Sequence, residues 1–181
     1  RVIRPIVAAR VSHPSTGESE CVYALVDSGA DRDYLSSRVR DRLGLEKRES
    51  LINLKTVGNQ SIGVREITDL ELQSMDGSYK AQIMDALVGD FPNSTNDVIP
   101  SKHDWSGIKH LENKPFIDLD EQVEMIISSA HGVAYAPKEK PETGERDQPI
   151  AINCAFGWRV EGPNGRRKGI QEESSIHFLS S

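Results

Sequence analysis

The tripeptide Asp27-Ser28-Gly29 contains the residue types in this chain that best fit catalysis. A carboxylate can hydrolyse a peptide bond together with a second carboxylate when the two share one proton and hold a water between them, one acting as base and the other as acid. The tripeptide occurs once in 181 residues. The second carboxylate is therefore expected from another copy of the chain.

The residues around the tripeptide must hold its carboxylate in place. An apolar run at positions 23–26 predicts a buried strand that carries Asp27 into the interior. The Ser28 hydroxyl is expected to hydrogen-bond beneath the site and brace the backbone, and Gly29 leaves room for main chain to pass close by. The plainer alternative is that Asp27 only caps the helix that follows.

A short helix is predicted after this turn. Its apolar positions recur every four residues, at Leu35, Val39 and Leu43. Asp33 or Ser36 suits the start of the helix as a cap, and Gly44 suits a left-handed end. Basic side chains alternate with acidic ones here and just beyond, at Arg38, Arg40, Arg42, Lys47 and Arg48. That alternation favours a solvated helix face over a phosphate site.

Strand patterns dominate the rest of the chain. Residues 6–11 and 21–26 are apolar-rich and are separated by a turn-forming group, which predicts a hairpin. Residues 67–72 and 79–88 flank an Asp-Gly turn and predict a second hairpin. The fold class expected is mainly β.

Two polar stretches interrupt this pattern. Residues 89–115 are expected to form an irregular connection with a short helical turn near 108–111, and residues 136–148 a surface loop. The tail from 164 to 173 is charged, and a terminal strand is expected from the apolar residues beyond it, Ile176, Phe178 and Leu179.

Taken together, the order and spacing of these segments resemble the retroviral-type aspartic proteases, and in particular the retropepsin-like domain of BEL/Pao-type retrotransposon polyproteins. The segments with counterparts in that family are residues 4–11, the run Asp27-Ser28-Gly29-Ala30-Asp31, the ending Arg42-Leu43-Gly44-Leu45, residues 54–61, 98–101, 104–105, 110–111, 149–151 and 156–162. The resemblance covers the chain almost from end to end.

This resemblance implies a retropepsin-like closed β-barrel or sandwich with one or two short helices, acting as a homodimer. The chain would be a single domain over 1–181 with insertions near 89–115 and 136–148. Two Asp27 carboxylates would face each other across a two-fold axis. The implied activity is that of an aspartic endopeptidase, without a cofactor, acting on a peptide or polyprotein.

The resemblance also implies roles for other residues. Ala30 and Asp31 would bind the substrate main chain. Val57, Gly58 and Asn59 would form the tip of a flap over the substrate, although an ordinary hairpin turn fits the same residues. The strand beneath the site would end in Ile126, Ile127 and Ser128.

Ser128 departs from the family pattern, which has glycine at this position. If the backbone there needs a positive φ angle, or if another segment lies against it, a serine costs roughly 1 kcal/mol or more. Ser128 and the long insertions favour the alternative function, a catalytically silent, domesticated domain used for dimerisation or peptide binding.

Composition narrows the partners and the compartment. Lys and Arg number 22 against 28 Asp and Glu, a net charge of −6, so no nucleic-acid surface is expected. No apolar run reaches the ~20 residues of a membrane span. Cys21 and Cys154 do not make a disulfide framework, and an intracellular, cytoplasmic location is expected. A chain that begins at Arg1 is expected to be a piece of a longer protein.

The remaining candidates point to structure rather than to ligands. The five histidines show no metal-ligand spacing with the cysteines, so no metal is expected. Trp105 and Trp158 are interpreted as core or interface anchors. Ala30 has a further consequence: it cannot donate a hydrogen bond to the carboxylate, as the hydroxyl residue of pepsin-like enzymes does, so the dyad should work nearer neutral pH.

Overall fold

The computed structural model describes residues 2–91, 99–100, 105–115 and 117–163. The terminal strand expected near residues 176–179 lies outside these residues. The strands are β1 Val2–Ile3, β2 Ile6–Ser12, β3 Ser19–Val26, β4 Tyr34–Ser36, β5 Arg48–Thr56, β6 Asn59–Ser74, β7 Lys80–Gly89, β8 Val123–Ile127, β9 Ile150–Cys154 and β10 Gly157–Pro163. The helices are α1 Ser37–Leu43 and α3 Gly132–Tyr135, and the 3-10 turn η2, Ser129–His131, precedes α3.

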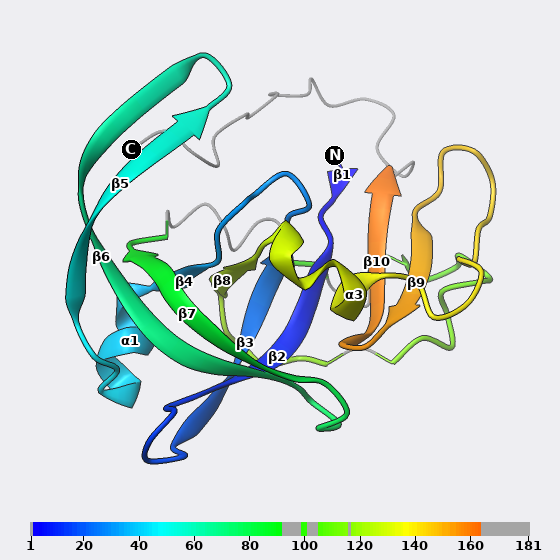
Figure 1. Ribbon diagram of the computed structural model, residues 1–181. Coiled ribbons are helices and arrows are strands. Elements are labelled where there is room, and N and C mark those ends of the chain that lie inside the picture. Colours follow the sequence, from blue (N-terminus) through cyan, green and yellow to red (C-terminus); the bar gives the residue numbers. More distant parts are fainter. Residues whose placement is uncertain (1, 92–98, 101–104, 116, 164–181) are drawn as a thin grey trace.

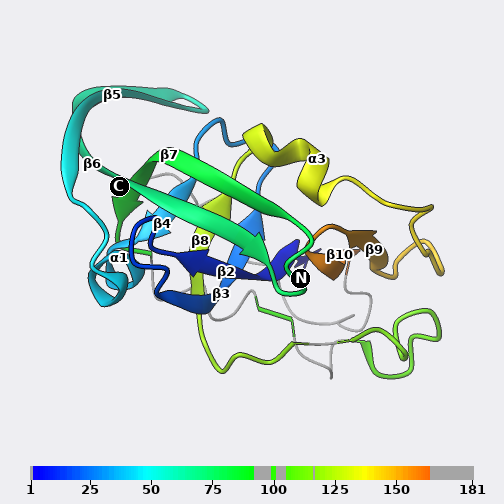
Figure 2. The ribbon, with the colours of Figure 1, turned by 60° about the horizontal axis from the view of Figure 1, so that its bottom comes forward.

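Six strands close into a barrel. Their order is β2-β3-β8-β4-β7-β6, and a second pairing of β6 with β2 closes the ring. Figure 2 shows β6 and β7 crossing over β2, β3 and β8, as the two sides of the barrel. The expected mainly β architecture with a closed barrel and two short helices is confirmed.

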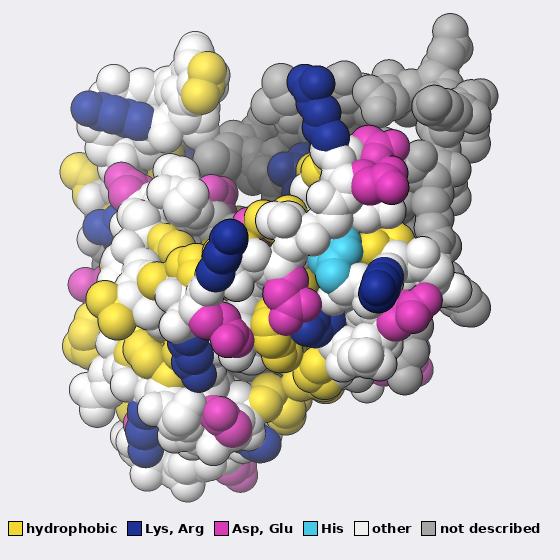
Figure 3. Space-filling model, turned by 90° about the vertical axis from the view of Figure 1, so that its right-hand side faces the viewer, with side chains coloured by type: hydrophobic (Ala, Val, Ile, Leu, Met, Phe, Trp, Pro, Cys, Tyr) yellow, Lys and Arg dark blue, Asp and Glu magenta, His cyan; other side chains and the backbone are white. Residues whose placement is uncertain are grey.

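A second, three-stranded sheet lies beside the barrel, in the order β1-β10-β9. Together with residues 105–111 it buries Trp105 in a small cluster with Ile3 and Leu111, and Trp158 packs against that cluster. Both tryptophans thus serve as core anchors, as the sequence indicates. Figure 3 views the molecule from this side and shows basic and acidic side chains interspersed.

Both predicted hairpins are present. Strands β2 and β3 pair from Ile6↔Leu25 to Ser12↔Ser19, and β6 pairs with β7. Alternation along β3 sends Val22, Ala24 and Val26 into the main core, whereas Tyr23 and Leu25 face a second apolar cluster. This division matters for the site, because it aims the residue after Val26 toward the side of the second cluster.

Helix α1 begins later than its apolar spacing suggests, because Leu35 belongs to β4. Ser36 is the N-cap and accepts a hydrogen bond from the Val39 N–H, and Gly44 ends the helix at φ +62°. Of the two candidate caps, Ser36 holds this position. Asp27 does not cap the helix.

The basic residues of α1 are ion-paired, and Arg40 departs from the expected solvated face, whereas Arg38 and Arg42 remain partly exposed. Arg40 is only 5% exposed and pairs with Glu66 and Asp41. Arg38 pairs with the buried Glu124 at 3.0 Å. Partners on β6 and β8 thus connect the helix to the barrel.

Neither insertion forms a regular strand in its described parts. Residues 105–114 make successive turns, including the expected one near 108–111. Residues 136–148 are held by a β-bridge between Glu142 and Ala151 and by a hydrogen bond from the Lys138 N–H to the Asn153 carbonyl. No helix among the described residues is both long and apolar enough to cross a membrane.

Candidate active site

Asp27 lies immediately after the end of β3, where the barrel positions it. Its backbone N–H donates to the Ile127 carbonyl of β8 at 3.0 Å, so the parallel β3–β8 pairing continues one residue into the loop. The Gly29 N–H donates to Asp27 Oδ1 at 2.9 Å, and the Ala30 N–H donates to the Asp27 carbonyl. The backbone is therefore fixed while the side chain stays half-buried.

Gly29 has a steric reason to be glycine. A Cβ built at this position would lie 3.2 Å from Asp27 Oδ1, which is tighter than ordinary van der Waals contact. The hydrogen bond from the Gly29 N–H to the Asp27 carboxylate is thus favoured by the absence of a side chain at position 29.

Ser28 does not brace the backbone within the protomer. Its side chain is exposed and makes no hydrogen bond to another described residue. The bracing comes instead from Ser129, whose N–H and Oγ both donate to the Ala30 carbonyl at 2.9 Å. Nothing in the local sequence pattern signals this partner, because it lies about a hundred residues further along the chain.

The three residues expected beneath the site lie there, at the end of β8 and just after it. Ile126, Ile127 and Ser128 are all buried, at 6%, 0% and 0% exposure. Ser128 has φ −82° and ψ 175°, an extended conformation open to any residue, and its Oγ accepts a hydrogen bond from the Ala130 N–H. The cost of a positive φ angle therefore does not arise at Ser128. The side chain is nevertheless fully buried, so neighbouring segments do lie against it.

A buried hydrogen-bond network lies behind the loop. Asp33 Oδ1 accepts from the Ser128 N–H at 2.9 Å, and Asp33 Oδ2 lies 2.9 Å from His131 Nε2. His131 Nδ1 is in turn 3.1 Å from the Tyr79 hydroxyl. From the sequence, Asp33 was predicted only as a candidate helix cap, and no role was predicted for His131 or Tyr79. The three side chains come together only in the folded barrel, where β8 pairs with β3.

The expected substrate-binding residues of the loop differ in exposure. Ala30 is partly buried and packs against the second apolar cluster, which contains Leu25 and Ile126. Asp31 is exposed. Tyr34 packs against the same cluster and meets Phe91 edge to face, with ring centroids 5.2 Å apart. The loop is thus bordered by an apolar surface on one side and by solvent on the other.

The residues expected at the flap tip do form the end of a hairpin. Strands β5 and β6 pair from Arg48↔Ile67 to Thr56↔Asn59, leaving Val57 and Gly58 as the turn. Val57 is fully exposed, and Gly58 has φ +85°. The hairpin arches out beyond the barrel on the side of the loop that follows β3 (Figure 1). No hydrogen bond joins this tip to residues 27–31 in the described part of the chain.

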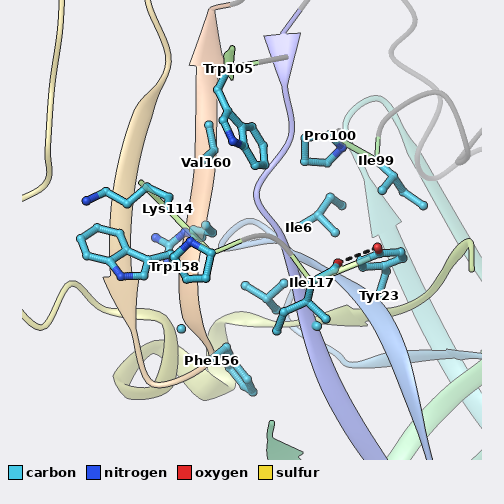
Figure 4. Close-up of a pocket in the computed structure, with 15 residues that line it drawn as sticks. Ile6, Tyr23, Ile99, Pro100, Trp105, Lys114, Ile117, Phe156, Trp158 and Val160 are labelled. Atoms are coloured by element: carbon cyan, nitrogen blue, oxygen red, sulfur yellow. Dashed lines mark hydrogen bonds between the residues drawn. The ribbon is translucent and has the colours of Figure 1, made fainter. Parts of the chain in front are cut away.

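A separate cavity of about 130 Å³ lies between β2, β10 and residues 99–117. Figure 4 shows its walls, which are mainly apolar and include Ile6, Trp105 and Trp158. Its polar groups are already engaged: the Tyr23 hydroxyl donates to the Ile117 carbonyl at 2.8 Å, and Lys114 Nζ donates to Glu142 at 2.7 Å. Asp27 does not line this cavity.

Among the described residues, no group of three or more His, Cys, Asp or Glu side chains could hold a metal ion. Cys21 and Cys154 are both free thiols.

Comparison with known proteins adds no family assignment. No protein-family model matches the chain. A search of curated proteins likewise finds no match.

Proposed function

We propose that this chain is one half of an aspartic endopeptidase of the dimeric retroviral type. The observation that carries the proposal is the setting of Asp27: its backbone is fixed by Ile127 and Ala30, its carboxylate has a backbone donor in Gly29, and its side chain remains open on one side. Such a carboxylate is held in one orientation and can still reach water and substrate.

The second carboxylate is assigned to another copy of the chain. Within the protomer, the Asp33 carboxylate is buried and engaged by the Ser128 N–H and His131, so it has no access to a water beside Asp27. Ser28 and Gly29 are exposed next to Asp27. A two-fold axis close to this turn would bring two Asp27 carboxylates together.

The mechanism follows from that pairing. Two carboxylates a few ångströms apart cannot both ionise cheaply, so they share one proton and titrate as a unit. The ionised Asp27 takes a proton from the water as it attacks the scissile carbonyl carbon, and the protonated Asp27 of the other copy gives its proton to the carbonyl oxygen. No covalent intermediate forms.

Surrounding features support a peptide or polyprotein as the substrate. Beside the loop, the partly buried side chains of Ala30 and Tyr34 offer apolar contact for a substrate side chain. The exposed Asp31 can accept hydrogen bonds from substrate main chain. The β5–β6 hairpin, with Gly58 at its tip, is long enough to fold over a bound peptide and exclude water.

The silent-domain alternative loses one of its two arguments. It drew on Ser128 in place of glycine and on the long insertions, and Ser128 adopts an extended conformation without positive-φ strain. The relaxed backbone at Ser128, together with the intact run from Asp27 to Asp31, favours the enzyme.

The test is digestion of a peptide library by wild type and by Asp27→Asn, with and without pepstatin, at several pH values. Wild type is expected to cleave, pepstatin to inhibit, and Asp27→Asn to lose at least about a thousandfold in kcat. Asp147→Asn, in the exposed loop of residues 136–148, is the matched control and should cleave normally. Cleavage that survives Asp27→Asn would remove Asp27 from the mechanism, and a wild type without cleavage would favour the silent domain.

A further inference from the structure

Asp33 connects the candidate catalytic loop to the strands behind it. Its carbonyl accepts from the Leu87 N–H of β7 at 3.0 Å, which fixes the backbone where the loop enters β4. Its carboxylate is 9% exposed and lies between the Ser128 N–H and His131 Nε2, both at 2.9 Å. A buried carboxylate with two such partners is held in one place.

The partners of His131 determine where its protons lie. An ionised Asp33 can only accept hydrogen bonds, so Nε2 must carry a proton. In the neutral ring Nδ1 is then an acceptor, and it faces the Tyr79 hydroxyl at 3.1 Å. Burial, reinforced by the charge of Asp33, raises the pKa of Tyr79 above its ordinary value, so its hydroxyl remains a donor.

These bonds form a continuous path to the candidate active site. The Tyr79 hydroxyl is joined to His131 Nδ1, His131 Nε2 is joined to Asp33 Oδ2, and the N–H of Ser128 donates to Asp33 Oδ1 from the other side. The next residue after Ser128 is Ser129, which places two donors on the Ala30 carbonyl. A shift of His131 would therefore move both segments that hold the loop of Asp27.

We propose that His131, as the neutral ring with its proton on Nε2, is a positioning residue that fixes the catalytic loop through Asp33 and Ser128. The inference rests on the proposed protease function, because positioning matters only if Asp27 reacts. It goes beyond that function by assigning a role to a histidine and a tyrosine outside the catalytic loop. Misplacement of a catalytic group lowers kcat more than it weakens substrate binding.

The first arm of the test examines the hydrogen-bond network directly and does not depend on enzymatic activity. Nitrogen chemical shifts of the His131 ring, recorded on the wild-type protein, should show a protonated Nε2 and an unprotonated Nδ1. Tyr79→Phe keeps the ring that packs edge to face on Phe156 at 5.4 Å and removes only the hydroxyl. This variant should change the His131 ring shifts and move the amide signals of residues 27–31. A wild-type proton on Nδ1, or unmoved loop amides in Tyr79→Phe, overturns the proposal.

The second arm is kinetic. His131→Leu removes the donor to Asp33 and should lower kcat about tenfold or more with KM changed less than about threefold. His131→Gln, whose amide can still donate to Asp33, should restore most of kcat. His110→Gln is the control, since that ring bonds only the Pro149 carbonyl, at 2.8 Å, away from the loop. A folded His131→Leu variant with wild-type kcat overturns the proposal.

The spectroscopic and kinetic arms distinguish a failure of the proposed protease function from a failure of the positioning role of His131. If wild type cleaves nothing, the proposed function fails, whereas the ring and amide signals still decide whether His131 positions the loop. If wild type cleaves and Asp27→Asn does not, the kinetic arm decides directly.

Discussion

At the scale of single residues, the side chain of Ala30 bears on the pH at which the Asp27 carboxylate should work. Its carbonyl is bound by Ser129 and its methyl group packs against the second apolar cluster. A methyl group cannot donate to the neighbouring Asp27 carboxylate, so nothing at this position favours the charged form. The catalytic pair should therefore hold its shared proton to a higher pH than the pair of a pepsin-like enzyme.

Ala30→Ser tests this expectation. The added hydroxyl can donate to the carboxylate and stabilise its charge, which should move the acidic limb of the pH–rate profile down by about half a unit to one unit. The measurement is kcat/KM against pH for wild type and variant in the same buffers. A wild-type profile that peaks well below about pH 4, or identical profiles, would contradict the expectation.

Asp76 gives a second prediction, for stability rather than catalysis. Its Oδ1 accepts from the Ser74 hydroxyl and from the N–H and hydroxyl of Ser78, and these bonds lower the pKa of Asp76 to about 2. A folded-state pKa below the unfolded value means that the stabilisation is present above about pH 4 and is lost as the pH falls toward 2.

Asp76→Asn should accordingly be less stable than wild type at neutral pH, and the gap should close as the pH falls from about 4 to about 2. Urea unfolding midpoints at several pH values measure it. Ser78→Ala, which removes one of the donors, should show a smaller effect of the same sign. A gap that widens on acidification would exclude this account of the turn.

Residue-scale predictions from the sequence succeeded where the cause is local. Ser36 caps its helix, as expected from the chemistry of its near neighbours. Gly29 was expected to make room for main chain, whereas the atom close to it is the carboxylate oxygen of Asp27. The bracing assigned to Ser28 was wrong within the protomer, because Ser129 supplies it from a distant segment. His131 was missed for the same reason: its partner Asp33 is close only in the folded barrel.

At the scale of elements, the β5–β6 hairpin is the part of the fold with the most direct functional consequence. The sequence predicted its tip but not the length of β6, which runs from Asn59 to Ser74. Leu70 and Leu72 of β6 are buried in the core, whereas Ile62 near the tip is 64% exposed. One strand thus serves both the barrel and the projecting hairpin, and periodicity alone does not show where the barrel ends.

Gly58→Ala and Gly17→Ala form a matched pair for testing the flap. Both glycines have a positive φ, +85° and +75°, and neither has a neighbouring atom within 4 Å of a built Cβ. Each alanine should therefore destabilise its turn by about 1 kcal/mol through backbone strain alone. Only the change at Gly58 should also alter kcat and KM, because only that turn is placed to close over substrate. Melting temperatures and steady-state kinetics of both variants give the answer, and equal kinetic effects would make β5–β6 an ordinary hairpin.

At the scale of the whole molecule, the barrel is compatible with the proposal that a second copy of the chain completes the site. The ring of strands closes through the pairing of β2 with β6. The loop after β3 lies at one end of the barrel, and the pairing of β3 with β8 holds it there. Among the described residues, Asp27 has no carboxylate partner placed to share a proton, because Asp33 is committed to Ser128 and His131. Closure of the barrel was expected from the family resemblance alone, and the commitment of Asp33 was not expected.

Mixing wild type with Asp27→Asn tests the pairing of two chains. If each active unit needs two Asp27 carboxylates, and the variant dimerises like wild type, activity after exchange should fall with the square of the wild-type fraction. Specific activity of wild type alone should also rise with protein concentration until dimers saturate, because dissociated protomers contribute none. Both are measured with one peptide substrate, and sedimentation gives the mass of the assembly under the same conditions. A linear fall with wild-type fraction, with specific activity independent of concentration, would mean that a single chain carries the whole site and that the role assigned to the second Asp27 is wrong.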